Sequence, residues 1–243
     1  KEKSKDVIVV ALHARGNLYK VLDKYDEAWS ELSKAISMKQ FINKNHVVDL
    51  YIQRADIRLA FQQYREAITY CDNALVLLRN VREIQREDSF ELSYQAYYNR
   101  AKAYVKLENR FMALCNLDTA YRQLILLEPT DTDAYYNLSA TYIELEQYAE
   151  AKKVATKALT VAPTDAKFYA LRGDMNFKLR GFEEALKDYN AAIMYSGAEP
   201  DYYHMRAYIK LQLEDREGGC EDLLQAVNMG YEPAKEDFEK VCR

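Results

Sequence analysis

Apolar and small residues follow helical spacing through residues 132–164. The first part carries a stripe at three- and four-residue steps, formed by Tyr135, Leu138, Ser139 and Tyr142. The second part carries a matching stripe of Ala151, Ala155, Ala158 and Leu159, and Pro163 ends it because proline lacks the backbone N–H that a continuing helix needs. The pattern predicts a hairpin of two antiparallel helices, 132–145 and about 148–162. One such hairpin cannot bury its own apolar face.

The same pattern occurs six times along the chain. A small residue opens each second helix: Ala28, Ala67, Ala113, Ala151, Ala185 and Gly219. Seven positions later an alanine follows every time: Ala35, Ala74, Ala120, Ala158, Ala192 and Ala226. The first helices carry a bulky residue and, four positions on, a small one: Leu12 and Gly16, Tyr51 and Ala55, Tyr97 and Ala101, Tyr135 and Ser139, Tyr169 and Gly173, Tyr203 and Ala207. Subtracting the opening positions gives spacings of 39, 46, 38, 34 and 34 residues.

A period near 34 residues with this pattern resembles the tetratricopeptide repeat. The resemblance covers about residues 9–230 and implies an all-α, right-handed solenoid of antiparallel helix hairpins, with about 13 helices and no β-sheet. We expect one array with repeats at about 9–47, 48–93, 94–131, 132–165, 166–199 and 200–230. Tyrosine or leucine stands where the family often has tryptophan, and only the last three copies follow at minimal spacing.

The end of the chain predicts a capping helix over residues 231–243. Pro233 suits a first helical turn, and Ala234, Phe238 and Val241 form one apolar edge. No matching cap precedes the first repeat, so that end is expected to be exposed or to continue into further chain. The excess length of the second copy falls in residues 79–93, where we expect a longer helix and then a loop at Glu87, Asp88 and Ser89.

Composition narrows the possible partners. The 243 residues carry a net charge of −4 with both signs interspersed, which gives no reason to expect nucleic acid or a membrane surface as a partner. No apolar run approaches the ~18 residues of a membrane span. The chain starts at Lys1, so a signal, an anchor or more repeats could precede it. Localisation stays open between cytoplasmic and exported.

The four cysteines of the chain bear on its localisation. Cys71 and Cys115 fall on second helices of different repeats, whose axes lie too far apart, ~8–10 Å, for easy bridging. Cys220 and Cys242 are the more suggestive pair, because the capping helix should fold back on the last repeat. Free, buried thiols are nevertheless the favoured interpretation. An oxidised Cys220–Cys242 pair would indicate an exported protein.

Arginine precedes the small residue of the first helix in five repeats, at Arg15, Arg54, Arg100, Arg172 and Arg206. A buried arginine needs an acceptor. The second helices offer Glu31, Asp188 and Asp222 at one depth and Asp72 and Asp118 two residues further on. The fourth repeat has Leu138 instead and lacks the acids, which indicates structural pairing. Since residues two apart point in different directions, one of the two acid sets could pair with a neighbouring repeat.

The sequence contains few residues or motifs that are typical of a catalytic site. His13, His46 and His204 are far apart and none stands in a metal-ligand spacing. The chain has no glycine-rich phosphate loop and no Gly-x-Ser-x-Gly motif. We therefore predict that the protein is not an enzyme and holds no metal or cofactor.

Function is then expected on a surface. The stripe of each first helix that points away from its partner should line the concave side of the stack; in the second and third repeats it comprises Asp49, Ile52, Asp56, Leu59 and Ala60, and Gln95, Tyr98, Lys102, Val105 and Lys106. Aromatic residues among mixed charges suit a peptide of a partner protein. The candidate groove residues are Asp56, Tyr98, Lys102, Lys106, Tyr136, Ile143, Asp174, Phe177 and Tyr208. Each could equally well cover a neighbouring helix.

Some members of the family hold the C-terminal carboxylate of chaperones in this groove with lysine, asparagine and arginine side chains. Here the matching sets are incomplete. Asn17 lacks its lysine because His13 stands there, and Asn137 with Lys167 lacks the arginine because Leu171 stands there. We predict no such clamp.

The sequence thus predicts an interaction scaffold that binds a protein segment between the second and fifth repeats. An alternative is a regulatory or sensor region of a larger protein whose effector or membrane part lies outside this chain. Self-association through the uncapped first repeat is a further possibility. The identity of the partner cannot be read from groove chemistry.

Overall fold

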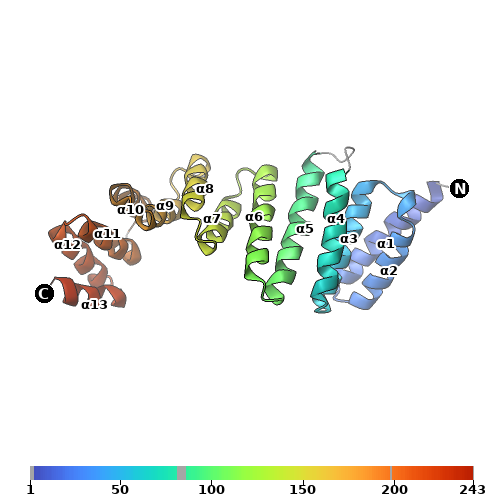
Figure 1. Ribbon diagram of the computed structural model, residues 1–243, viewed down its shortest axis with the longest axis horizontal. Helices are drawn as coiled ribbons and strands as arrows, with labels where there is room; N and C mark the ends of the chain where they lie inside the picture. The colour runs from blue at the N-terminus through green and yellow to red at the C-terminus, as the bar shows by residue number, and fades with distance from the viewer. Residues whose placement is uncertain (1–2, 81–85, 198, 243) are drawn as a thin grey trace. The chain divides into compact units, whose positions relative to one another are not determined.

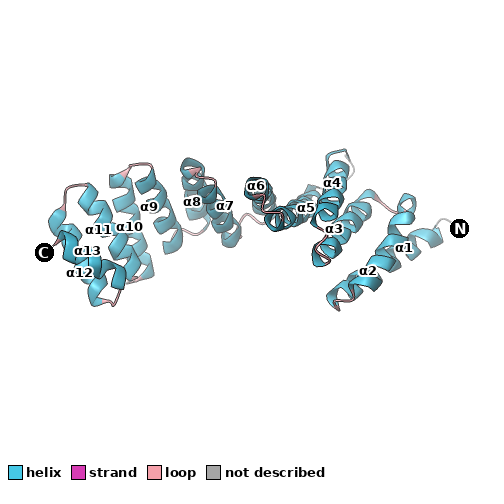
Figure 2. Ribbon diagram, turned by 60° about the horizontal axis from the view of Figure 1, so that its bottom comes forward, coloured by secondary structure: helices cyan, strands magenta, loops and turns pink. Residues whose placement is uncertain are grey.

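The structure is a computed structural model that describes residues 3–80, 86–197 and 199–242. Within these residues it contains thirteen α-helices, one short 3-10 helix and no strand (Figures 1 and 2). The chain divides into two compact units, Lys1–Pro129 (unit 1) and Thr130–Arg243 (unit 2). The predicted all-α hairpin architecture is confirmed. That all six hairpins form one continuous array stays a prediction.

Unit 1 contains three hairpins joined in series. Their helices are α1 (Lys3–Val21) and α2 (Tyr25–Ser37), α3 (Lys44–Ala60) and α4 (Tyr64–Asn80), and α5 (Arg86–Lys106) and α6 (Arg110–Leu127), with the 3-10 helix at Lys39–Phe41. Each hairpin packs on the next through its even-numbered helix, α2 on α3 and α4 on α5, and α3 also contacts α5. The odd-numbered helices of unit 1 therefore contact one another, α1 with α3 and α3 with α5.

Unit 2 repeats this arrangement and adds a last helix. It comprises α7 (Thr132–Glu144) and α8 (Tyr148–Val161), α9 (Ala166–Lys178) and α10 (Phe182–Ser196), α11 (Pro200–Gln212) and α12 (Arg216–Asn228), and α13 (Glu232–Val241). Helix α8 packs on α9, α10 on α11 and α12 on α13. The predicted capping helix is α13, which buries Ala234 completely and packs Phe238 against the cluster around Leu223.

The small residues of the repeat lie where the helices approach most closely. The alanines at the two repeat positions of the second helices, from Ala28 to Ala226, are all buried. A side-chain carbon on Gly16 would come within 2.6 Å of Leu32, and one on Gly173 within 2.9 Å of the Tyr189 ring. The sequence pattern thus marks helix contacts too tight for a larger residue.

The six hairpin turns share one backbone conformation. A residue with positive φ precedes each second helix: Asp23, Gln62, Glu108, Glu146, Arg180 and Glu214, with φ between 56° and 64°. The N–H of the following residue bonds to a carbonyl five positions back, for example Lys24 to Tyr19 at 2.9 Å and Gly181 to Asn176 at 2.8 Å. This left-handed closure usually takes glycine. Here no glycine occupies this position, so the turn conformation could not be predicted from the residue types.

The structure corrects one prediction about a connection. Glu87, Asp88 and Ser89 belong to α5, which begins at Arg86, and do not form a loop. Helix α3 begins at Lys44, where the Asn43 side chain accepts from the N–H of His46 and caps the helix. The rest of the predicted extension, residues 81–85, lies outside the described residues.

The preference for free thiols is wrong for one pair of cysteines. Cys220 on α12 and Cys242 after α13 form a disulfide, with their Cα atoms 5.7 Å apart. The capping helix brings the two together across 22 residues of sequence. Cys71 and Cys115 are free, and burial raises the pKa of Cys71 to about 12, so its thiol stays neutral and packs as a small apolar residue.

The five arginines pair with the second helix of their own hairpin, as their spacing suggested, but two of them bind a residue that is not an acid. Three arginines reach the acid sixteen residues later: Arg15 Nε to Glu31 at 2.9 Å, Arg172 Nη2 to Asp188 at 2.6 Å and Arg206 Nη2 to Asp222 at 2.6 Å. At the same separation, Arg100 reaches Asn116 at 2.7 Å and Arg54 reaches the Tyr70 hydroxyl at 3.0 Å. The sixteen-residue pair therefore joins the two helices of a hairpin.

The acceptors two residues further along the second helix bind the arginine of the next hairpin. Arg100 pairs with Asp72 at 2.5 Å, Arg206 with Asn190 at 2.8 Å and Arg54 with Ser33 at 3.4 Å. Each acceptor lies eighteen residues after the arginine of the preceding hairpin, by subtraction 72 − 54, 190 − 172 and 33 − 15. Asp118, the other acid at this depth, pairs with Arg122 in its own helix at 2.8 Å. These arginines thus fix adjacent hairpins to each other as well as the helices within one hairpin.

Candidate functional site

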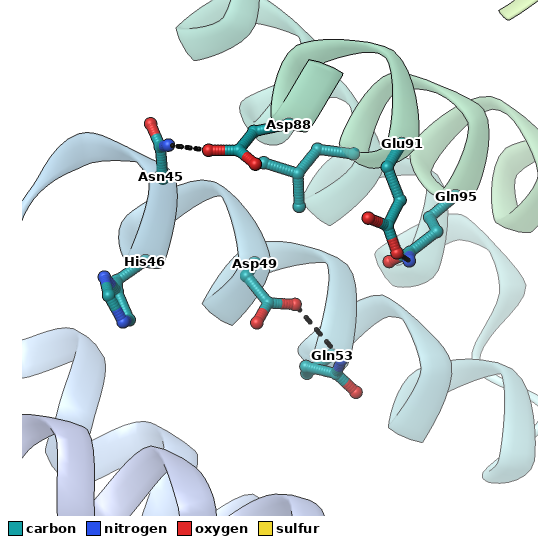
Figure 3. A pocket seen from close by; sticks show the side chains of 8 residues that line it. Asn45, His46, Asp49, Gln53, Asp88, Glu91 and Gln95 are labelled. Atoms are coloured by element: carbon teal, nitrogen blue, oxygen red, sulfur yellow. Dashed lines mark hydrogen bonds between the residues drawn. The ribbon is translucent and has the colours of Figure 1, made fainter. Parts of the chain in front are cut away.

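The odd-numbered helices of unit 1 leave one face uncovered, which we call the odd-helix face. A cleft of about 320 Å³ opens on it between the first turns of α3 and α5 (Figure 3). Its lining is polar apart from one leucine: Asn45, His46, Asp49 and Gln53 from α3, and Asp88, Glu91, Leu92 and Gln95 from α5. Three carboxylates and three amides against one histidine give the cleft an acidic, hydrogen-bonding surface. We call it the acidic cleft.

Hydrogen bonds hold the walls of the acidic cleft in place. Asn45 donates to Asp88 across it at 3.0 Å, and Gln53 donates to Asp49 at 3.1 Å (Figure 3). His13 of α1 reaches Asp49 from behind, with Nε2 3.2 Å from the carboxylate. Burial works to raise the pKa of Asp49, but His13, Gln53 and the Lys20 charge outweigh it, so this pKa lies below its ordinary value. Asp49 therefore stays a carboxylate at neutral pH.

A second pocket lies at the other ends of the same two helices. It measures about 260 Å³ and is lined by Leu59, Tyr64, Lys102, Val105 and Lys106. Lys102 and Lys106 are exposed, and the Lys102 ammonium lies 4.5 Å from the centre of the Tyr98 ring. An apolar floor flanked by two cations can hold an apolar side chain beside an anionic group. We call this the lysine pocket.

A hydrogen-bonded chain crosses the face between the two pockets. Asp56 of α3 accepts from Lys20 of α1 at 2.8 Å and from Asn99 of α5 at 2.7 Å. Lys20 also donates to Gln53. These contacts join all three odd-numbered helices of unit 1, so the spacing between the acidic cleft and the lysine pocket is set by internal bonds.

Unit 2 has a separate pocket on its own odd-numbered helices. It measures about 400 Å³ and is lined by Thr132, Asp133, Tyr136, Asp165, Lys167 and Phe168. Tyr136 is 48% exposed, so about half of its side chain is open to a partner. Phe168 is buried, so the pocket presents a polar rim with one exposed ring.

The last hairpin of unit 2 uses its odd-helix residues internally. Tyr208 donates to Asp237 of α13 at 2.5 Å, and His204 Nε2 lies 2.8 Å from the same carboxylate. The hydrogen bond from Tyr208, opposed by burial and supported by His204, holds the pKa of Asp237 below its ordinary value. The same hydrogen bond and burial raise the pKa of Tyr208 to about 12. These residues attach α13 to α11.

Comparison with known proteins agrees with the repeat pattern. Residues 132–165 match the tetratricopeptide repeat model. Solved structures of such proteins share the fold. The crystal structure of YrrB, described as a TPR protein with an unusual peptide-binding site, superimposes with a TM-score of 0.56 at 23% identity, covering 81% of this chain and 91% of that one. The chain thus has the fold of tetratricopeptide repeat proteins, and residues 132–165 match the repeat itself. MamA from Desulfovibrio magneticus RS-1 is also similar, with a TM-score of 0.51 and 20% identity over 77% of this chain and 96% of that one.

The predicted groove residues have different environments. Lys102 and Lys106 line the lysine pocket, and Tyr136 lines the pocket of unit 2. Asp56 and Tyr98 lie on the odd-helix face but are half-buried by internal contacts; Tyr98 stacks on Tyr94 at 5.6 Å. Ile143 is half-buried. That these residues bind a ligand stays a prediction.

Three predicted groove residues serve the interior of unit 2. Asp174 accepts from the Tyr189 hydroxyl at 2.5 Å, and burial raises the pKa of Asp174 in spite of that bond. Phe177 packs on Phe182 at 5.5 Å beside the core cluster of α9 and α10. Tyr208 is held by α13 as described above. Sequence spacing placed all three on the correct side of their helices, but it could not show which neighbours would cover them.

Sequence reasoning missed six of the eight residues that line the acidic cleft. The predicted stripe included Asp49 and Gln95, and the residues that it did not include are Asn45, His46, Gln53, Asp88, Glu91 and Leu92. Asp88 was expected in a loop, whereas it lies in the first turn of α5. The available signal for Asn45 and His46 was Asn43, because asparagine is a preferred residue at the N-cap of a helix.

Within the described residues no three histidine, cysteine or acidic side chains come together in an arrangement that could hold a metal ion. None of the helices in the described ranges has the length and apolar character needed to cross a bilayer.

Proposed function

We propose that this tetratricopeptide repeat protein is a non-enzymatic scaffold that binds a segment of a partner protein along the odd-helix face of unit 1. The observation that carries the proposal is the pair of pockets at opposite ends of α3 and α5. Their side chains are ordered by hydrogen bonds and by packing on one another, and Asp88, Glu91, Lys102 and Lys106 are exposed to solvent. Binding sites on repeat scaffolds are surfaces of this kind.

The shape of the face favours a peptide over a small molecule. Both pockets are open, and together they follow the length of two helices. Leu59, Tyr64 and Val105 supply apolar contact, while Gln53 and Gln95 supply hydrogen bonds that an extended backbone can use. A segment lying between α3 and α5 would contact both pockets at once, which a compact ligand cannot do.

A face-specific substitution tests this proposal. Twelve-residue peptides are selected from a random library on the intact protein, and their affinities are measured by fluorescence anisotropy. Val105→Asp should weaken binding at least tenfold, since it places a charge in the lysine pocket's apolar floor. Val76→Asp on α4 is the matched control, because the two valines are 56% and 52% exposed. Failure to select any peptide, or equal losses in both variants, would reject the odd-helix face.

A further inference from the structure

The two pockets of the odd-helix face have opposite charge. At one end the acidic cleft presents Asp49, Asp88 and Glu91. At the other the lysine pocket presents Lys102 and Lys106 beside Leu59 and Val105. Both ends are built from the same two helices, so any segment that spans them meets a negative surface first and a positive, partly apolar surface second.

Internal pairing leaves this polarity intact. In the acidic cleft Asp88 accepts from Asn45 at 3.0 Å and Glu91 from Gln95 at 3.2 Å, and these neutral amides do not cancel the charge of the carboxylates. Lys102 has the Tyr98 ring as its close neighbour, and a ring does not cancel its charge. By contrast, Lys20 and Asp56 in the middle of the face form an ion pair at 2.8 Å. The net field therefore comes from the two ends.

We propose that the partner is a segment of mixed charge, with a basic residue in the acidic cleft and an acidic residue next to an apolar one in the lysine pocket. This deepens the proposed function and rests on it. Charge complementarity carries the choice: an ammonium or guanidinium can accept the carboxylates and amide oxygens at the first end, and a carboxylate can pair with the two lysines at the second.

The geometry also sets the spacing of the partner's charges. Glu91 and Lys102 are eleven residues apart on α5 (102 − 91), and a helix rises 1.5 Å per residue, which places the two ends about 16 Å apart. An extended chain covers about 3.3 Å per residue, so its basic and acidic residues should lie about five positions apart. A uniformly basic or uniformly acidic segment would be repelled at one end.

The library selection described above supplies the first readout. Sequencing the selected peptides should show a lysine or arginine and, about five positions away, an aspartate or glutamate with an apolar neighbour. Replacing both charged residues of a selected peptide by glutamine should weaken its binding about tenfold, and the loss should shrink as salt is raised.

A charge-swapped protein supplies the second readout. Glu91→Lys with Lys106→Glu reverses one exposed charge at each end and leaves the net charge at −4. We expect about five- to tenfold weaker binding of the selected peptides. Glu27→Lys with Arg65→Glu is the matched control on the exposed surfaces of α2 and α4 and should change affinity less than twofold.

The outcomes separate this inference from the proposed function. Peptides that bind the odd-helix face without a charge preference, or that bind the swapped protein as well as the original, would reject the mixed-charge partner and keep the scaffold. Enrichment of purely acidic or purely basic peptides would reject it as well. Absence of any selected peptide would reject both.

Discussion

The first and last hairpins each pair one acid of the second helix with two cations, in different surroundings. Glu31 meets Arg15 of α1 and Lys34 of its own helix, while Asp222 meets Arg206 and Lys210, both of α11. The acid side chains are almost equally buried, 9% and 6% exposed. The cations differ, because Arg15 and Lys34 are 54% and 58% exposed, while Arg206 and Lys210 are 18% and 17% exposed.

A neighbouring helix accounts for the difference between the two arginines. Arg206 lies against α10, whose Asn190 accepts from it at 2.8 Å, and α13 is bonded to the same hairpin through Tyr208 and Asp237. In the described part of the chain no earlier hairpin offers Arg15 such an acceptor, and Val7, Leu18 and Val21 of the same helix are exposed as well. The arginine–acid pair of the repeat is therefore screened by water in the first hairpin and largely shielded from water in the last. The energetic role of a repeat residue depends on whether a neighbour covers it.

The largest expected difference comes from removing the acid in each motif. Asp222→Leu leaves two partly buried cations unpaired and should cost about 3–5 kcal/mol of the stability of unit 2. Glu31→Leu leaves cations that water already solvates, so its loss should be clearly smaller. Chemical denaturation, with hydrogen exchange to locate the unfolding unit, measures both. Asp222→Asn, which keeps an acceptor, is the control. Equal losses of stability in the two leucine variants would mean that neighbouring helices do not determine how much these ion pairs contribute to the free energy of unfolding.

The next effect concerns the disulfide that holds the capped end. Cys220→Ser with Cys242→Ser should destabilise the α11–α13 region by about 3 kcal/mol, because the bond closes a loop of 22 residues and restricts the unfolded chain. Hydrogen exchange of peptides from α12 and α13 should rise, while exchange in α1 and α2 should not change. Cys115→Ser, which breaks no bond, is the control. Unchanged protection of α13 would show that Ala234 and Phe238 hold the cap without the disulfide.

The smallest expected effect on stability is at the open end. Val7, Ala11, Ala14, Leu18 and Val21 follow one another at steps of four and three residues on exposed positions of α1, the spacing of a helix-packing stripe. Leu18→Glu should change stability by less than about 0.5 kcal/mol, because no neighbour covers the side chain. It should also reduce any concentration-dependent association seen by analytical ultracentrifugation. A destabilisation above that range would show that α1 has a hidden packing partner.

The same comparison explains where sequence reasoning succeeded. The spacing of Tyr135, Ser139 and the alanines predicted the helices and the close contacts correctly, because these residues interact within their own hairpin. The loop predicted at Glu87 to Ser89 was wrong, since three charged or polar residues are also compatible with the first turn of a helix. The positive φ at Glu108 and Arg180 gave no sequence signal, because it is imposed by closure of the hairpin on residues that do not favour it.

The sequence by itself determined six helix hairpins, their tight alanine contacts, the arginine series and the capping helix, because each follows from residue spacing within about one repeat. Only the tertiary structure decided that Asp72 serves Arg100 of the next hairpin, that Tyr208 belongs to α13, that Cys220 and Cys242 are bonded, and that acidic and lysine-bearing pockets face opposite ends of α3 and α5. The physical reason is that a helix face becomes core, ion pair or open surface according to which neighbouring helix covers it, and spacing along one helix does not contain that information.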